Sequence, residues 1–114
     1  MAKDDYPVIL YQVLAYLYNC LKKDLPVEKE YLEARGKLFR INTNYWRFVL
    51  YNLQKDGYIC GLTMTKVWGE KYPMISDIEQ AEITPKGIEY LTENSFIHKA
   101  KELLKDTKAI IPFV

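Results

Sequence analysis

Apolar residues recur at helical spacing along the first part of the chain. Over residues 6–23 they follow the i, i+3, i+4, i+7 pattern, and tyrosines widen the stripe. The members are Ile9, Leu10, Val13, Leu14, Leu17, Cys20 and Leu21, with Tyr11, Tyr16 and Tyr18. A helix that is apolar on most sides is buried on more than one face. We therefore expect a central core helix here, with a dimer contact as the alternative.

Two further helices joined by a short turn follow in the pattern. Helical spacing covers residues 27–35, and residues 37–41 form the turn. Asn42 or Thr43 caps a third helix, which ends at Gly57. The buried stripe of this third helix consists of Trp46, Val49, Leu50 and Leu53. This arrangement predicts a helix-turn-helix, because the last helix also has a polar and aromatic outer face.

A β-hairpin is predicted next. Residues 58–67 are rich in β-branched, aromatic and threonine residues, and a returning strand occupies part of residues 74–83. Residues 68–73 form the turn between them, and the returning strand is expected to be irregular around Ser76. This hairpin, about 58–83, is the predicted wing.

Two C-terminal helices, over about residues 84–107, complete the pattern. Thr84 caps the first of them and Pro85 takes its favoured first position. The final helix covers about 96–107, and the tail 108–114 is apolar. The apolar side of the final helix consists of Ile97, Ala100, Leu103 and Leu104. An exposed apolar tail would be a solubility liability, so it either packs back or meets a partner.

The composition fits one ordinary globular domain. The chain has 114 residues, enough to bury one core, so we expect a single winged-helix domain over 1–114. The fold class is mainly α (α+β): a winged helix-turn-helix with a two-stranded wing and an extra C-terminal helix. Two distant cysteines and the lack of a secretory signal predict a cytoplasmic protein with reduced thiols. The longest apolar stretch is too short to span a membrane.

Two motifs of the chain resemble those of a known family. They are Gly57-Tyr58-Ile59-Cys60-Gly61 and Ile83-Thr84-Pro85-Lys86-Gly87-Ile88-Glu89-Tyr90-Leu91-Thr92-Glu93-Asn94-Ser95, the second followed by Lys99-Ala100. Over roughly residues 8–105, the chain resembles the YjcQ family of small winged-helix proteins from Gram-positive bacteria and their phages and prophages. The resemblance implies a winged helix, supplies no catalytic or ligand residues, and raises the expectation of DNA transactions or host-takeover interactions.

The sequence does not favour an enzyme. His98 has no oriented partner at a recognisable spacing, and a solvent-exposed helix residue is the simpler interpretation. Cys20, Cys60 and His98 lack the clustered spacing of a zinc site, and the glycines match no phosphate-binding loop. We therefore expect no catalytic residue, no metal, no cofactor, no small-molecule substrate and no membrane partner.

Duplex DNA is the first partner hypothesis. In a helix-turn-helix the second helix meets base edges near its N-terminus, which would place Asn44 and Arg47 at bases. The phosphate-contact candidates are Lys37, Arg40, Lys55, Lys66 and Lys71. A net charge of +1 with scattered cations predicts modest affinity unless a dimer doubles the surface.

A protein partner or a homodimer is the second hypothesis, close behind the first. Phe48 and Tyr51 lie on the same outer face and suit a phosphate-rich groove poorly, whereas exposed aromatic residues anchor protein interfaces. The tail contributes Ile110, Ile111 and Phe113 as further interface candidates. The sequence narrowly favours a non-enzymatic, DNA-associated regulator over a protein-binding adaptor.

Overall fold

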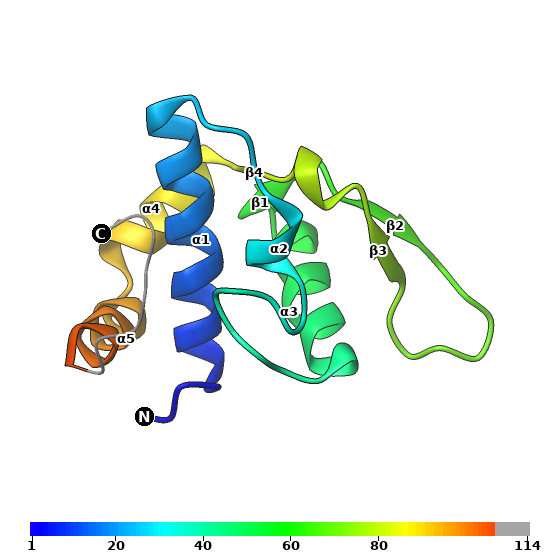
Figure 1. Ribbon diagram of the computed structural model, residues 1–114, viewed down its shortest axis with the longest axis horizontal. Helices are drawn as coiled ribbons and strands as arrows, with labels where there is room; N and C mark the ends of the chain where they lie inside the picture. The colour runs from blue at the N-terminus through cyan, green and yellow to red at the C-terminus, as the bar shows by residue number, and fades with distance from the viewer. Residues whose placement is uncertain (107–114) are drawn as a thin grey trace.

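A computed structural model describes residues 1–106 of the chain. Its elements, in order, are α1 (Tyr6–Lys23), α2 (Lys29–Leu32), α3 (Thr43–Lys55), β1 (Ile59–Cys60), β2 (Thr63–Thr65), β3 (Met74–Ser76), η1 (Ile78–Gln80), β4 (Glu82–Ile83), α4 (Pro85–Glu93) and α5 (Ser95–Asp106). The fold is mainly helical, with a wing-like antiparallel hairpin and a C-terminal helix, as the sequence predicts (Figure 1).

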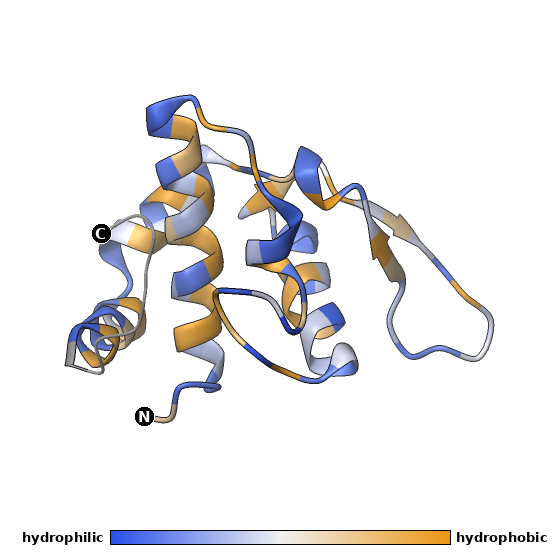
Figure 2. Cartoon of the chain, viewed as in Figure 1, coloured by the Kyte–Doolittle hydropathy of each residue, from blue (hydrophilic) through white to orange (hydrophobic). Residues whose placement is uncertain are grey.

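Helix α1 is the central element, and the prediction of a core helix over residues 6–23 is confirmed. It lies between α4 and α5 on one side and α2 and α3 on the other (Figure 1). Apolar residues cover several of its sides (Figure 2), and both Tyr11 and Tyr16 are buried. Gln12 is buried among them, and its Nε2 donates to the Leu38 carbonyl at 2.6 Å. Neighbours on several sides explain why this helix is apolar nearly all round.

Helix α3 begins and packs as its sequence predicts. The Asn42 side chain accepts a hydrogen bond from the Tyr45 backbone N–H at 2.8 Å, which caps the helix. Its buried residues are Trp46, Val49, Leu50 and Leu53. The Trp46 indole donates to the Leu32 carbonyl at 2.7 Å. This bond fixes α3 against the end of α2, and the polar and aromatic face of α3 is left pointing outward.

The predicted second helix over 27–35 is wrong in length, since α2 covers only Lys29–Leu32. The chain becomes extended at Glu33, and Arg35 forms an isolated β-bridge with Arg40. The Ile41 backbone N–H also donates to the Ala34 carbonyl at 2.8 Å. The backbone groups that would continue the helix are therefore used to close a tight loop.

The continuous strand predicted over 58–67 is also wrong, because the hairpin is split in two. β1 pairs with β4 near the core, and β2 pairs with β3 farther out. Between them, the Gln54 side chain of α3 bonds both backbone groups of Leu62, each at 2.9 Å. The returning chain is irregular at Asp77 (φ 58°) and continues into η1, which confirms the irregularity expected around Ser76.

The two C-terminal helices form where predicted. Thr84 caps α4 by accepting from the Gly87 N–H at 3.0 Å, and Pro85 is its first residue. Along α5, Ile97, Ala100 and Leu104 are buried against the core. The tail and its interface candidates Ile110, Ile111 and Phe113 lie outside the described residues.

Candidate interaction surface

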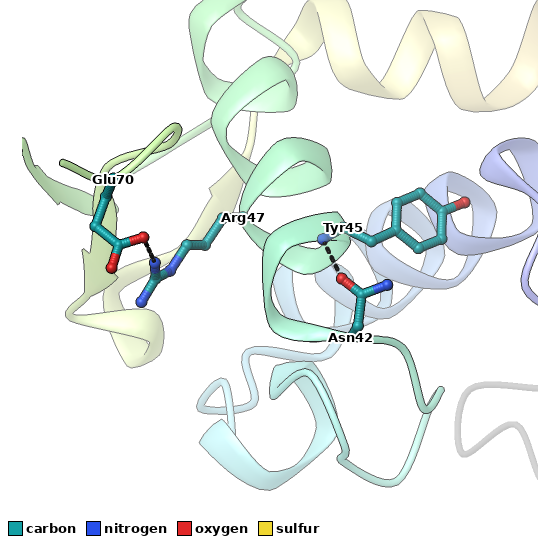
Figure 3. A network of polar contacts seen from close by, with 4 residues as sticks. All are labelled: Asn42, Tyr45, Arg47 and Glu70. Carbon is teal, nitrogen blue, oxygen red and sulfur yellow. Dashed lines mark hydrogen bonds and ion pairs between the residues drawn. The ribbon is translucent and has the colours of Figure 1, made fainter.

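The outer turn of the wing lies against the outer face of α3. Arg47 projects from α3 toward Glu70 on the wing, with 3.4 Å between its Nη1 and the Glu70 Oε2 (Figure 3). Only 18% of the Arg47 side chain is exposed, against 46% for Glu70. The guanidinium that the sequence placed at DNA bases is therefore partnered and largely covered by the wing.

Aromatic rings link α1, α3 and the wing across this face. Phe48 contacts Tyr6 and Tyr72, with 5.7 Å between ring centroids in each pair, and Tyr51 lies 6.5 Å from Tyr72. We call these four residues, Tyr6, Phe48, Tyr51 and Tyr72, the aromatic band. Each is half-buried or exposed, so the band presents ring surface to solvent while its members support one another.

Lysines lie over the rings of the band and of a neighbouring pair. Lys55 lies 5.8 Å from the Tyr51 ring centroid, and Lys71 lies 5.6 Å from that of Tyr72. Both lysines are exposed. An ammonium over a ring face gains about 0.5–1 kcal/mol at an exposed site. The surface therefore combines flat aromatic area with positive charge held beside it.

Tyr58 and Tyr90 extend this surface toward α4. Their ring centroids are 4.6 Å apart, and Lys86 lies 5.0 Å from the Tyr58 centroid. The Lys86 Nζ also donates to the Asp56 carbonyl at 2.7 Å, just beyond the end of α3. A cation at this position satisfies a helix C-terminus and complements its dipole.

The phenol of Tyr6 connects the two groups of rings electrostatically. Burial raises the pKa of Tyr6 above its ordinary value of 10.0, and the neighbouring Tyr90 and Asp56 raise it further. The phenol stays protonated at neutral pH and can donate a hydrogen bond to a partner. Tyr45, whose pKa burial also raises, already donates to the Asp4 carbonyl at 2.7 Å.

The structure brings together five of the residues singled out by sequence reasoning. They are Arg47, Phe48, Tyr51, Lys55 and Lys71. Lys66 is exposed on the same wing, and Asn44 is exposed at the start of α3. Lys37 and Arg40 instead lie in the loop after α2, where Lys37 is 5.0 Å from the Tyr31 ring centroid. The predicted phosphate contacts therefore do not form one cluster.

Sequence reasoning missed three members of this surface on α1 and the wing, as well as Tyr58, Tyr90 and Lys86 toward α4. Tyr72 and Glu70 lie in the segment predicted only as a turn, and Tyr6 begins a helix interpreted as core. Alternation of charged and aromatic residues in Glu70-Lys71-Tyr72 was the available signal. It could not show that the turn folds back onto α3, since that contact depends on how the hairpin bends.

A cavity of about 490 Å³ lies between α1 and the C-terminal helices, and its lining includes His98. The His98 Nε2 lies 2.7 Å from the Thr92 carbonyl, and no carboxylate lines this cavity among residues 1–106. Within that range, no three His, Cys, Asp or Glu residues gather as metal ligands, and both Cys20 and Cys60 are free thiols.

Among residues 1–106, none of the helices has the length and apolar character of a membrane-spanning segment.

Comparisons with known proteins agree with the motifs. No curated protein and no solved structure matches the chain. A family model described as YjcQ protein matches residues 11–110, which include the surface residues of α3, the wing and α4. Because the match covers most of the chain, this protein belongs to the YjcQ family.

Proposed function

We propose that the chain is a non-enzymatic protein-binding module that meets its partner through the aromatic band. The observation that carries the proposal is the position of the wing over α3. Glu70 pairs with Arg47, and Tyr72 packs on Phe48 and near Tyr51, so aromatic rings dominate this face of α3 and Lys55 is its one exposed cation within residues 43–55. Aromatic residues are enriched in protein interfaces and supply most of their hot spots.

The overall charge supports a protein partner over a nucleic acid. The net charge is +1 and the sequence pI is about 7.7, whereas a domain pI above about 9 is typical of nucleic-acid binders. Non-specific affinity for DNA comes almost wholly from neutralised phosphates. The three exposed lysines that lie beside rings of this surface, Lys55, Lys71 and Lys86, would neutralise few phosphates. They suit the polar rim of a protein interface.

The test compares partner capture by matched variants of the full chain. Immobilised wild-type protein is exposed to an extract of the cells that produce it, beside Tyr51→Glu, Lys55→Glu and Lys101→Glu. We expect a partner retained by the wild type and by Lys101→Glu, whose position is exposed on α5, and lost with both surface variants. Light scattering of the same samples detects a homodimer. Unchanged capture by the folded Lys55→Glu and Tyr51→Glu proteins would contradict the proposal.

Duplex DNA remains the second candidate, favoured by one specific observation. Asn44 is exposed at the N-terminus of α3, where a helix-turn-helix meets base edges, and Lys66 and Lys71 lie exposed on the wing. For DNA to be the ligand, the wing must release Arg47. Glu70→Gln should then strengthen binding to mixed duplex DNA in fluorescence anisotropy, and Arg47→Ala should weaken it. Absence of binding at low salt in both proteins would exclude this candidate.

A further inference from the structure

The tip of the wing presents a tryptophan to solvent. The relative exposure of Trp68 is 100%, whereas Trp46 is buried in α3. Tryptophan carries the largest contact area of any side chain, and it is prominent among interface hot spots. A single exposed apolar residue is ordinary on a protein surface, so the way in which Trp68 is held decides what it means.

A hydrogen-bonded turn fixes the backbone at Trp68. The Glu70 N–H donates to the Val67 carbonyl at 3.1 Å, and Gly69 has φ +85°. A positive φ at the third residue of a four-residue turn is the signature of type II, with Trp68 in the second position. Nothing lies within 4 Å of a Cβ built at Gly69, so this side of the turn faces open space.

The residues after this turn hold it against α3. Glu70 pairs with Arg47 at 3.4 Å, and the Tyr72 ring packs on Phe48 and near Tyr51. The loop is thus tied to a helix at two positions, Glu70 and Tyr72, in addition to its connection to the strands. An ordered loop loses less conformational entropy on binding, which favours affinity at the residue that it displays.

The charges around Trp68 indicate the kind of partner. Lys66 and Lys71 are exposed on either side of the turn, and the one carboxylate between them, Glu70, is partnered by Arg47. The hairpin as a whole, residues 57–83, carries two lysines against four carboxylates. Two lysines neutralise too few charges for firm binding to a phosphate polymer or an anionic bilayer, whereas they can pair with individual carboxylates. The tip suits a protein surface that is apolar at its centre and acidic at its edge.

We propose that Trp68 is the anchor of the interface and inserts into an apolar pocket, rimmed by carboxylates, on the partner protein. This inference rests on the proposed function and names the chemistry of its partner. Lys66 and Lys71 pair with the rim, and the aromatic band makes the contacts beside the pocket. The band and the anchor then form one continuous binding face on α3 and the wing.

Site-specific crosslinking followed by titration tests the anchor. The full chain carrying p-benzoylphenylalanine in place of Trp68 is irradiated in the cells that produce it, and the crosslinked residues are identified by mass spectrometry. The purified partner is then titrated calorimetrically with wild type, Trp68→Ala, Trp68→Phe and Lys101→Ala. We expect crosslinks to an apolar pocket with acidic neighbours. Trp68→Ala should weaken binding about thirtyfold or more, as expected of a hot spot. Trp68→Phe should weaken it less, and Lys101→Ala should change nothing.

The outcomes separate this inference from the proposed function. A partner that depends on Tyr51 and Lys55 but binds Trp68→Ala within about twofold of wild type overturns the anchor and leaves the proposed function intact. If the partner binds Tyr51→Glu and Lys55→Glu as tightly as wild type, the proposed function itself is overturned. Absence of a crosslink at position 68 also overturns the anchor. So does Trp68-dependent binding to phosphatidylglycerol vesicles or to oligothymidylate in place of a protein.

Discussion

At the scale of single residues, the partner and the burial of Arg47 matter most for the shape of the surface. Its ion pair with Glu70 is 3.4 Å long, and its own side chain is mostly covered. A guanidinium that reads a base must present its donors in the groove, and these donors face the wing instead (Figure 3). The pair also ties the wing to α3, so Arg47 contributes to the shape of the surface.

The ion pair is expected to contribute little to overall stability. Because nearly half of the Glu70 side chain is exposed, solvent screens the attraction, and a double-mutant cycle should give a coupling of about 0.2–1 kcal/mol. Arg47→Met, Glu70→Gln and the double variant supply the cycle, with urea denaturation as the measurement. A coupling of several kcal/mol would show that the pair is desolvated in solution.

Among the secondary-structure elements, α4 depends on a single residue for its start and its attachment. The Thr84 hydroxyl accepts from the Gly87 N–H at 3.0 Å and donates to the Gly57 carbonyl at 2.6 Å. The same side chain thus caps α4 and holds it to the chain leaving α3. Lys86 adds a second link by reaching the Asp56 carbonyl.

Loss of the single Thr84 hydroxyl should therefore lower the free energy of unfolding noticeably. Thr84→Val keeps the shape and removes both hydrogen bonds, and an N-cap loss costs about 0.5–2 kcal/mol. We expect the free energy of unfolding in urea to fall within the upper half of that range. Thr84→Ser retains the hydroxyl and is the control. Unchanged stability in Thr84→Val with a loss in Thr84→Ser would mean that the methyl group, and not the hydrogen bonds, matters.

Gly87 sets how closely α4 approaches the hairpin. A Cβ at this position would lie 2.1 Å from the Tyr58 carbonyl oxygen and 2.8 Å from the Ile83 Cγ1. Alanine normally stabilises a helix interior relative to glycine by about 0.5–1 kcal/mol. Here the backbone must shift to admit it, so the requirement for close approach outweighs helix propensity.

Gly87→Ala should consequently destabilise the protein by about 1–3 kcal/mol, the usual range for overpacking. The measurement is thermal or urea unfolding followed by circular dichroism. Gly69→Ala is the matched control, since its added Cβ meets nothing and only the positive φ opposes it, at about 1–2 kcal/mol. A stabilised Gly87→Ala protein would show that α4 does not pack as closely as described.

At the scale of the whole molecule, five tyrosines of α1, α3 and α4 have phenols with a raised pKa. Burial raises the pKa of each above the ordinary value of 10.0. These residues are Tyr6, Tyr11, Tyr16, Tyr45 and Tyr90. Tyr16 is the most strongly shifted of them, and its hydroxyl accepts a hydrogen bond from the Glu28 N–H at 2.8 Å.

Stability should accordingly fall in alkali. A phenol whose pKa is raised in the folded state binds its proton more tightly there, so its contribution is complete below pH 10.0, the unfolded value. That contribution is lost as the pH rises through the folded pKa. Unfolding should accompany tyrosinate formation, followed together by ultraviolet absorbance and circular dichroism. Complete ionisation of all tyrosines with an unchanged helical signal would contradict the burial described for Tyr16.

Parts of the surface could be predicted from the sequence where the residues that form them are close together along the chain. Phe48, Tyr51 and Lys55 were predicted on the outer face of α3, because position on a helix follows from spacing alone. Glu70 and Tyr72 could be placed only in a turn. The hairpin is interrupted at Leu62, which Gln54 bonds, and at Asp77, and no local pattern specifies how its outer part then lies on α3.

The sequence by itself determined α1, α3 and the start of α4, since apolar periodicity and capping residues act within a few positions along the chain. Tertiary structure decided where α2 ends, because the link between Arg35 and Arg40 competes with the helix for backbone hydrogen bonds. It also decided whether the outer face of α3 presents a free guanidinium. Whether Arg47 is free or covered depends on Glu70, twenty-three positions away, and no local pattern records a contact at that range.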